Sequence, residues 1–265
     1  MPKLFLPFFT LILFFCALAP AASAQAFAKD TAAEDVLARA IKTLGGENYL
    51  RVTSQVGRGK FSVIRDNAVV SFQTFIDVLV YPDKERTEFK GGGNRTVQTN
   101  SGNTGWTFDA GNSTIKEQNE AQVREFKRGI RVSLDNLLRG QWRNEASLTY
   151  IGKRAATLGK RNDVVKLVYT DGFTVEFEFA ADDGLPAKAI YSRTGADSVE
   201  LKEEDRYAQF VDVKGVRIPF IIDRFTNGQQ SSRINYESVE LNTPVSDSVF
   251  TRPSSAKDLK KDLKL

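Results

Sequence analysis

The chain has 265 residues, with 37 lysines and arginines against 33 acidic residues, a formal net charge of +4, one cysteine and no histidine. Without histidine it has neither a Ser-His-Asp triad nor the commonest protein ligand of transition metals. The opposite charges are interleaved along the sequence, so the small positive excess does not indicate a nucleic-acid-binding protein.

The first 24 residues are predicted to be a secretory signal peptide. Lys3 precedes an apolar run over residues 4–19, and Ala22-Ser23-Ala24 follows as a cleavage site of small residues. A cut after Ala26 is also compatible with the sequence. A membrane anchor is the weaker interpretation, because the run is shorter than the roughly 20 apolar residues that a span needs. Cys16 lies inside the run, so we expect the mature chain to have no disulfide.

The next elements are predicted to be one helix and a long series of strands. Residues 30–44 carry an apolar stripe at helical spacing and end at Gly45-Gly46, where helices commonly stop. From residue 52 onward the period changes to two, with turn-forming pairs such as Asp66-Asn67 and Asp171-Gly172 between the segments. We count about eleven strands joined by hairpins, which indicates an antiparallel sheet in a protein of the α+β class.

The segment 68–81 has apolar residues on both of its faces. One face holds Phe72, Ile76 and Val78, and the other holds Phe75, Leu79 and Tyr81. A strand with one face in water does not need this pattern, so both faces are expected to be covered.

Residues 115–143 are predicted to form a helical insert within this run of strands. Its apolar residues, mostly three or four apart, make one stripe on a helix: Val123, Phe126, Ile130, Leu134, Leu137, Leu138 and Trp142. Gly129 lowers helix propensity and Ser133 is suited to cap a second helix, so we expect two helical pieces with a bend between these residues. Such a stripe must be buried, and we expect the insert to be a lid over the sheet.

The chain is rich in phenylalanine, and many of these rings fall on strand positions that are expected to face inward. A core filled with rings and a concave sheet holding a large apolar ligand explain this about equally well. On the second interpretation, the sheet residues expected to line the cavity are Phe72, Ile76, Val78, Trp106, Phe108, Phe173, Val175 and Phe177. The lid residues expected to close it are Phe126, Ile130, Leu134 and Leu138.

The acidic residues show no spacing typical of a catalytic or metal site. Glu176 and Glu178 alternate with phenylalanines on one strand, and residues 203–205 form an acidic run, so both sets are expected to be solvated. Asp182-Asp183-Gly184 lacks the later ligands of a calcium loop. We therefore expect no catalytic residue, no metal and no cofactor. A carboxylate hydrolase, the remaining enzymatic alternative, would need two buried acids that face each other.

Several short motifs are distributed over nearly the whole mature chain. They are Leu44-Gly45-Gly46, Gly105-Trp106-Thr107-Phe108-Asp109, Leu137-Leu138, Gly215-Val216-Arg217-Ile218-Pro219 and Asn242-Thr243-Pro244-Val245. With the signal peptide and the order of elements, these motifs make the chain resemble the LolA/LolB family of periplasmic lipoprotein carriers.

The resemblance implies a curved, incomplete antiparallel barrel with an N-terminal helix and a helical lid insert that fills its open mouth. It also implies a periplasmic, non-enzymatic carrier that shelters lipid or lipoprotein acyl chains in an apolar cavity, as a monomer that meets membrane-bound donor or acceptor proteins. In the carriers an arginine near the early strands helps to hold the lid closed. Arg58, Arg65 and Arg86 are candidates for that arginine here.

The expected organisation is a signal peptide over residues 1–24, one domain over 25–253 and a Lys-rich tail over 254–265. The tail is expected to be flexible, or to form a transient amphipathic segment at an anionic membrane surface. The alternative to a lipid carrier is an envelope-assembly or sensor module that binds a protein partner through its sheet face and has no lipid cargo.

Overall fold

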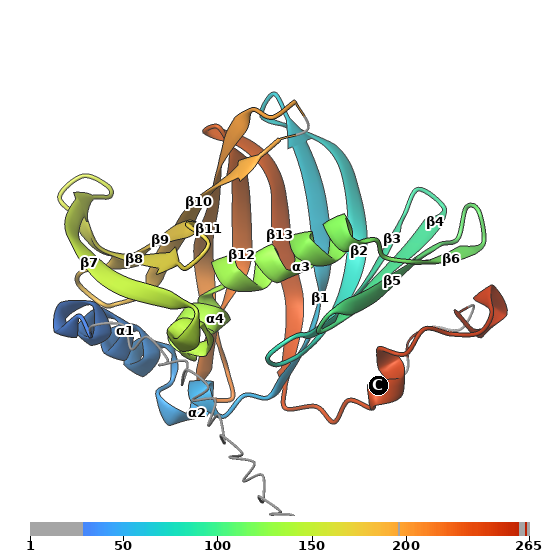
Figure 1. Cartoon of the computed structure of the whole chain (residues 1–265), viewed down its shortest axis with the longest axis horizontal. Coiled ribbons are helices and arrows are strands. Elements are labelled where there is room, and N and C mark those ends of the chain that lie inside the picture. The colour runs from blue at the N-terminus through green and yellow to red at the C-terminus, as the bar shows by residue number, and fades with distance from the viewer. Residues whose placement is uncertain (1–28, 196, 260–262, 264–265) are drawn as a thin grey trace, which may run out of the picture.

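One antiparallel sheet of thirteen strands forms the body of the protein in the computed structural model, which describes residues 29–195, 197–259 and 263 (Figure 1). The strands are β1 (Ser54–Arg65), β2 (Ala68–Val80), β3 (Lys84–Gly91), β4 (Asn94–Ser101), β5 (Thr104–Asp109), β6 (Thr114–Glu117), β7 (Ala146–Ala155), β8 (Arg161–Tyr169), β9 (Thr174–Ala180), β10 (Pro186–Thr194), β11 (Glu200–Val213), β12 (Val216–Thr226) and β13 (Gln229–Leu241). The predicted signal peptide lies outside the described residues. Within them, no helix is long and apolar enough to cross a membrane.

The sheet is curled and open. Its strands follow chain order, except that β1 pairs with β13 at the centre, which leaves β6 and β7 as the two edges of the described sheet. The expected number was about eleven strands. One difference is that the first residues of the predicted insert form β6, where Ile115 lies opposite Phe108 and gains apolar neighbours, instead of beginning a helix.

Close approach of β13 to β1 depends on glycine. A Cβ at Gly57 would lie 2.4 Å from the Tyr236 ring, and one at Gly59 would lie 2.1 Å from the carbonyl oxygen of Asn235. The β1–β13 register also shifts between Arg58 and Gly59. A bulge of this kind bends a strand and increases its twist, so it contributes to the curl at the centre of the sheet.

Helices pack on one face of the sheet, which we call the inner face. α1 (Thr31–Leu44) begins after Asp30, whose carboxylate caps its first turn, and ends at Gly45 with a φ of 128°. α2 (Glu47–Leu50) follows it directly. The buried stripe of α1 joins a core on the β7–β10 side of the sheet that includes the fully buried Phe177. The predicted N-terminal helix is thus an integral part of the core.

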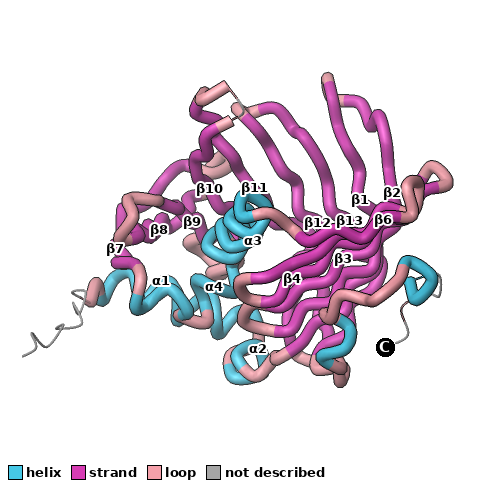
Figure 2. The backbone as a smooth tube through the Cα atoms, turned by 45° about the vertical axis from the view of Figure 1, so that its right-hand side comes forward, coloured by secondary structure: helices cyan, strands magenta, loops and turns pink. Residues whose placement is uncertain are grey.

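The insert contains two helices, as its sequence predicted. They are α3 (Glu120–Val132) and α4 (Leu134–Leu138), followed by the 3-10 helix η1 (Gln141–Asn144). Ser133 separates α3 from α4, and its hydroxyl accepts a hydrogen bond from the Asn136 N–H at 3.1 Å. α3 continues through Gly129, so the bend lies at Ser133. Figure 2 shows α3 crossing the hollow of the sheet, between the β10–β11 side and the β3–β6 side.

The opposite face, which we call the outer face, is covered by the C-terminal segment along β2–β5. This segment contains the 3-10 helices η2 (Asp247–Val249) and η3 (Ala256–Leu259). Leu259 is buried against Trp106, whose indole N–H donates to the carbonyl oxygen of Phe250 at 2.9 Å. Residues 256–259, which were expected to belong to a flexible tail, therefore dock on the sheet.

We expect Gly57→Ala to destabilise the protein by about 1–3 kcal/mol, because the added Cβ collides with the Tyr236 ring. Gly129→Ala is the matched control, because nothing lies within 4 Å of a Cβ there. Replacing this helical glycine should raise the free energy of unfolding by about 0.5–1 kcal/mol. Urea denaturation measures both variants. Equal stability of the two would contradict the tight contact at Gly57.

Candidate functional site

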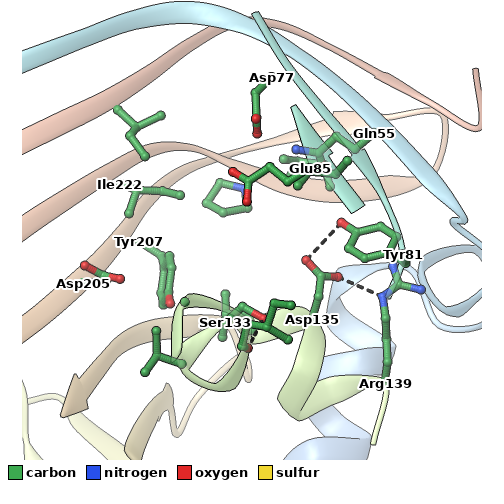
Figure 3. A pocket seen from close by; sticks show the side chains of 18 of the residues that line it. Gln55, Asp77, Tyr81, Glu85, Ser133, Asp135, Arg139, Asp205, Tyr207 and Ile222 are labelled. Carbon is green, nitrogen blue, oxygen red and sulfur yellow. Dashed lines mark hydrogen bonds and ion pairs between the residues drawn. The ribbon is translucent and has the colours of Figure 1, made fainter. Parts of the chain in front are cut away.

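A cavity of about 680 Å³ lies between the inner face of the sheet and the helices α3 and α4 (Figure 3). Its apolar lining includes Leu79, Phe126, Ile130, Leu134, Ile222 and Ile234. Its polar lining includes Gln55, Asp77, Glu85, Asp205, Tyr207 and Tyr236. The cavity therefore combines an apolar surface with several carboxyl groups.

Three of the four predicted lid residues line this cavity. Phe126 and Ile130 reach it from α3, and Leu134 reaches it from α4. Leu138 instead belongs to the core and is 4% exposed. It lies at the end of α4, which also packs against α1.

The predicted sheet residues lie outside the lining of this cavity. Ile76 and Val78 pack beneath the C-terminal segment on the outer face, and Phe72 is 63% exposed. Side chains alternate along a strand, so the inner face of β2 carries Asp77 and Leu79 instead. The predicted residues Phe72, Ile76 and Val78 lie on the other face of this strand.

The remaining predicted residues pack in two other places. Trp106 and Phe108 lie on the outer face beneath the C-terminal segment. Phe173, Val175 and Phe177 belong to the core on the inner face, where packed helices and strands fill the space around them. These last three residues lie on the same face of the sheet as the cavity, but they are not part of its lining.

A pair of acids inside the cavity was not anticipated. Asp77 is 8% exposed, and its Oδ1 accepts a hydrogen bond from the Thr87 hydroxyl at 2.7 Å, while Glu85 Oε1 lies 3.3 Å from the same hydroxyl. Burial, followed by the charge of Glu85, raises the pKa of Asp77 to about 8, and burial also raises the pKa of Glu85. At neutral pH the pair therefore retains a proton. Two acids facing one cavity are also the arrangement stated above for a carboxylate hydrolase.

A third carboxyl, Asp205 on β11, faces the same space (Figure 3). Its Oδ1 lies 3.7 Å from Nε of Arg224, and burial raises its pKa. Burial also raises the pKa of the phenols of Tyr207 and Tyr236, which therefore stay neutral. Arg224 is the guanidinium whose charge favours ionisation of Asp77, Glu85 and Asp205 alike.

The sequence contains a signal for one of these acids. Asp77 shares a strand face with Phe75 and Leu79, and an acid on a covered face of a strand is unusual. Glu85 and Asp205 have no such signal, because each has charged neighbours in the sequence that are typical of a solvated segment.

The acids that were expected to be solvated are largely buried. Glu178 is 1% exposed and pairs with Arg154 at 2.7 Å. Glu203 is 8% exposed and pairs with Arg193 at 2.7 Å. Cross-strand arginines thus satisfy carboxylates that a strand-alternation argument places in water.

Arg139 fixes α4 to the rest of the protein. Its guanidinium donates to Asp135 Oδ1 at 2.9 Å and to the carbonyl oxygens of residues 49, 50 and 52 at 2.9–3.1 Å. It also lies over the Tyr81 ring, 4.3 Å from the centroid. The Tyr49 phenol donates to the same Asp135 oxygen at 2.9 Å. The Tyr81 phenol donates to Oδ2 of Asp135 at 3.0 Å (Figure 3). We call this group of residues the Arg139 anchor.

Arg139, which anchors α4, was not among the three candidate arginines. Arg58 pairs with Glu240 at 2.6 Å, and Arg86 is held beneath the C-terminal segment on the outer face. Arg65 is exposed next to the β1–β2 turn. Arg139 belongs to the insert itself. The charges of the insert have the pattern of an ordinary solvated helix face, so the sequence did not single out this arginine.

Comparison with known proteins agrees with this architecture. No family model matches the chain, and no curated protein matches it by sequence. The structure is similar to that of a DUF1329 family protein from Desulfovibrio piger, with a TM-score of 0.58 and 10% identity, over 83% of this chain and 97% of that chain. It is also similar to a LolA superfamily protein from Nitrosomonas europaea, with a TM-score of 0.54 and 15% identity, over 83% and 97% of the two chains. The chain therefore has the LolA-like fold that the resemblance implied.

We expect Arg139→Met to destabilise the protein by about 3 kcal/mol, because Asp135 loses its charged partner and three carbonyl groups lose a donor. Arg143→Met is the control, since the side chain of Arg143 is 51% exposed in its pair with Glu34 and exposed pairs contribute at most about 1 kcal/mol. Urea denaturation compares them. A similar small loss in both variants would show that packing alone holds α4.

We expect Asp77→Asn to become progressively more stable than the wild-type protein as the pH rises from about 4 to about 8. The pKa of Asp77 is about 8 in the folded protein and near 3.8 in the unfolded chain. Between about pH 4 and about pH 8 only the folded protein holds this proton, so rising pH lowers the stability of the wild-type protein. Asparagine does not ionise, so the variant escapes this loss. Its advantage at about pH 8 should reach at least about 1 kcal/mol.

Thermal denaturation over this pH range measures the difference. Asp66→Asn is the control, because Asp66 lies at the exposed β1–β2 turn and its exchange should leave the wild-type curve unchanged. Parallel curves for Asp77→Asn and the wild-type protein would contradict the raised pKa.

Proposed function

We propose that this chain, which has the LolA-like fold, is an exported, non-enzymatic protein that binds lipid or lipoprotein acyl chains under α3 and α4. The observation that carries the proposal is the cavity of about 680 Å³, which has apolar side chains on both its sheet wall and its helical wall. Its volume lies within the range of about 300–1,000 Å³ typical of ligand pockets. Burial of the methylene groups of an acyl chain there would contribute about 0.8 kcal/mol each.

The contacts of α3 support its role as the lid. Next to its N-terminal end, Gln118 accepts a hydrogen bond from Asn100 at 2.7 Å, and at its C-terminal end Arg131 pairs with Asp171 at 2.6 Å. Between these ties, Phe126 is the buried side chain of α3. A helix tied at both ends and held by one ring in between can seal the empty cavity and lift when a chain enters.

The proposal includes the compartment and the partners. The predicted signal peptide over residues 1–24 directs export to the periplasm, and residues 25–253 act as one carrier domain. The protein works as a monomer that takes its cargo from one membrane-bound protein and gives it to another. It uses no cofactor, because sheltering an acyl chain requires only apolar surface and a gate.

Native mass spectrometry of the protein purified from its natural compartment tests this function. We expect a bound lipid of intact mass, and uptake of a fluorescent fatty acid once that lipid has been removed. A bound product of hydrolysis would favour the carboxylate hydrolase. Protein that carries no lipid and takes up no fatty acid would overturn the proposal.

We expect Phe126→Asp to weaken fatty-acid binding by at least about tenfold, because a charge replaces the ring that closes the cavity. Ala121→Asp is the matched control: it adds the same charge to an exposed position of α3. Fluorescence titration compares the two variants. Equal affinities would count against α3 as the lid.

A protein-binding module is the second candidate function. It is favoured by apolar side chains exposed near the start of β2, where Val69 is 60%, Val70 54% and Phe72 63% exposed. In this alternative the outer rim of the sheet docks on an envelope protein and the cavity stays empty. Failure of both lipid measurements, combined with loss of a crosslinked partner in Phe72→Ser, would support it.

A further inference from the structure

The two acids of the cavity share a single donor. Asp77 on β2 is paired in register with Thr87 on β3, and Glu85 lies one step further along the same face of β3. The Thr87 hydroxyl lies within hydrogen-bond distance of both carboxyls but has only one proton to give. Within the described chain, no protein group donates a hydrogen bond to the second oxygen of Asp77, and that oxygen keeps some contact with solvent.

Other charges that line the cavity do not supply the missing partner. Three further acids are already paired within the protein: Glu203 with Arg193, Asp135 with Arg139 and Glu125 with Arg128. Lys84, at the rim, pairs with Asp247 at 2.7 Å, and Arg217 is exposed. These groups are therefore committed elsewhere or in contact with water.

Arg224 is the remaining cation near three carboxyl groups of the described lining, those of Asp77, Glu85 and Asp205. It lies 3.7 Å from Asp205 and also opposes the raised pKa of Asp77 and Glu85. The groups packed around this space, Tyr207 and Tyr236, are neutral phenols. The lining of the cavity thus has more acidic than basic groups, and this excess is balanced by carboxyls that stay protonated rather than by internal ion pairs.

A cavity that bound only hydrocarbon would have no use for these acids, because burying them costs free energy. A ligand with an anionic head would add a further negative charge to the excess. A ligand with an ammonium head would supply the missing cation and three N–H donors, while its chain lay along Leu79, Phe126 and Ile130.

We propose that Asp77 and Glu85 form a subsite for the ammonium head of a single-chain cationic amphiphile whose tail occupies the apolar part of the cavity. This inference rests on the proposed function and names the chemical class of the ligand. When the ammonium group enters, the carboxyl pair releases its retained proton to solvent, and both carboxylates then face the cation.

Isothermal titration with three probes of equal chain length tests the subsite: dodecylamine, dodecanol and dodecanoate, each below its micellar concentration. At about pH 7 we expect the wild-type protein to bind dodecylamine at least about tenfold more tightly than either other probe. Titration in two buffers of different ionisation enthalpy should show proton release with dodecylamine and little with dodecanol. Dodecylamine affinity should fall as the pH is lowered, because the carboxyls then hold their protons more firmly.

The double variant Asp77→Asn/Glu85→Gln removes the subsite with little change in shape. We expect it to lose at least about tenfold in dodecylamine affinity and to lose the proton release, while its dodecanol affinity stays within about twofold. Asp66→Asn/Glu237→Gln removes two exposed acids instead and should behave like the wild-type protein.

The outcomes separate this inference from the proposed function. If dodecanol and dodecanoate bind as tightly as dodecylamine, or if the double variant still prefers dodecylamine, the ammonium subsite is wrong and the lipid-binding function stands. If none of the three probes binds, the proposed function fails and the subsite with it.

Discussion

The Arg139 anchor is the interaction on which the cavity depends. A curled, open sheet has one hollow face, and the hollow becomes an enclosed site only when another element spans it at a fixed distance. Arg139 and Asp135 fix α4 by hydrogen-bonding to the carbonyl groups at the end of α2 and just after it, and to the phenols of Tyr49 and Tyr81. Because α3 joins α4 at Ser133, the position of α3 over the sheet follows from this contact. A partly buried ion pair can fix the connection between two helices when further hydrogen bonds offset its desolvation penalty.

The same sheet is covered on both faces by different parts of the chain. Helices from the N-terminus and the insert occupy the inner face, and the C-terminal segment occupies the outer face. Beneath that segment, Glu88 is 1% exposed between Arg86 and Arg95, and Arg86 also donates to the carbonyl oxygen of Val249. Buried charges of this kind are stable only when fully paired, so they position the C-terminal segment as well as the strands. β2 has apolar residues on both faces because each face is covered by another part of the chain.

Particular residues show where the sequence was sufficient. The stripe of α1, the break at Ser133 and the hairpin turns follow from local rules of spacing, capping and backbone conformation, and each was found from them. The faces of β2 were also separated correctly. Which face is hollow was not, because alternation assigns side chains to two sets without saying which set meets the helices.

The sequence by itself determined the class of the protein: an α+β chain with an antiparallel sheet, a first helix and a two-piece insert. That the sheet is open was implied only by the resemblance to a known family. Only the tertiary structure decided that the acids Asp77, Glu85 and Asp205 meet in one cavity and that Arg139 anchors the insert. The reason is that periodicity and capping are local, whereas curvature, register and the pairing of a charge with a carbonyl far along the chain depend on contacts between elements. A carboxyl among charged neighbours in sequence looks solvated until the curl of the sheet encloses it.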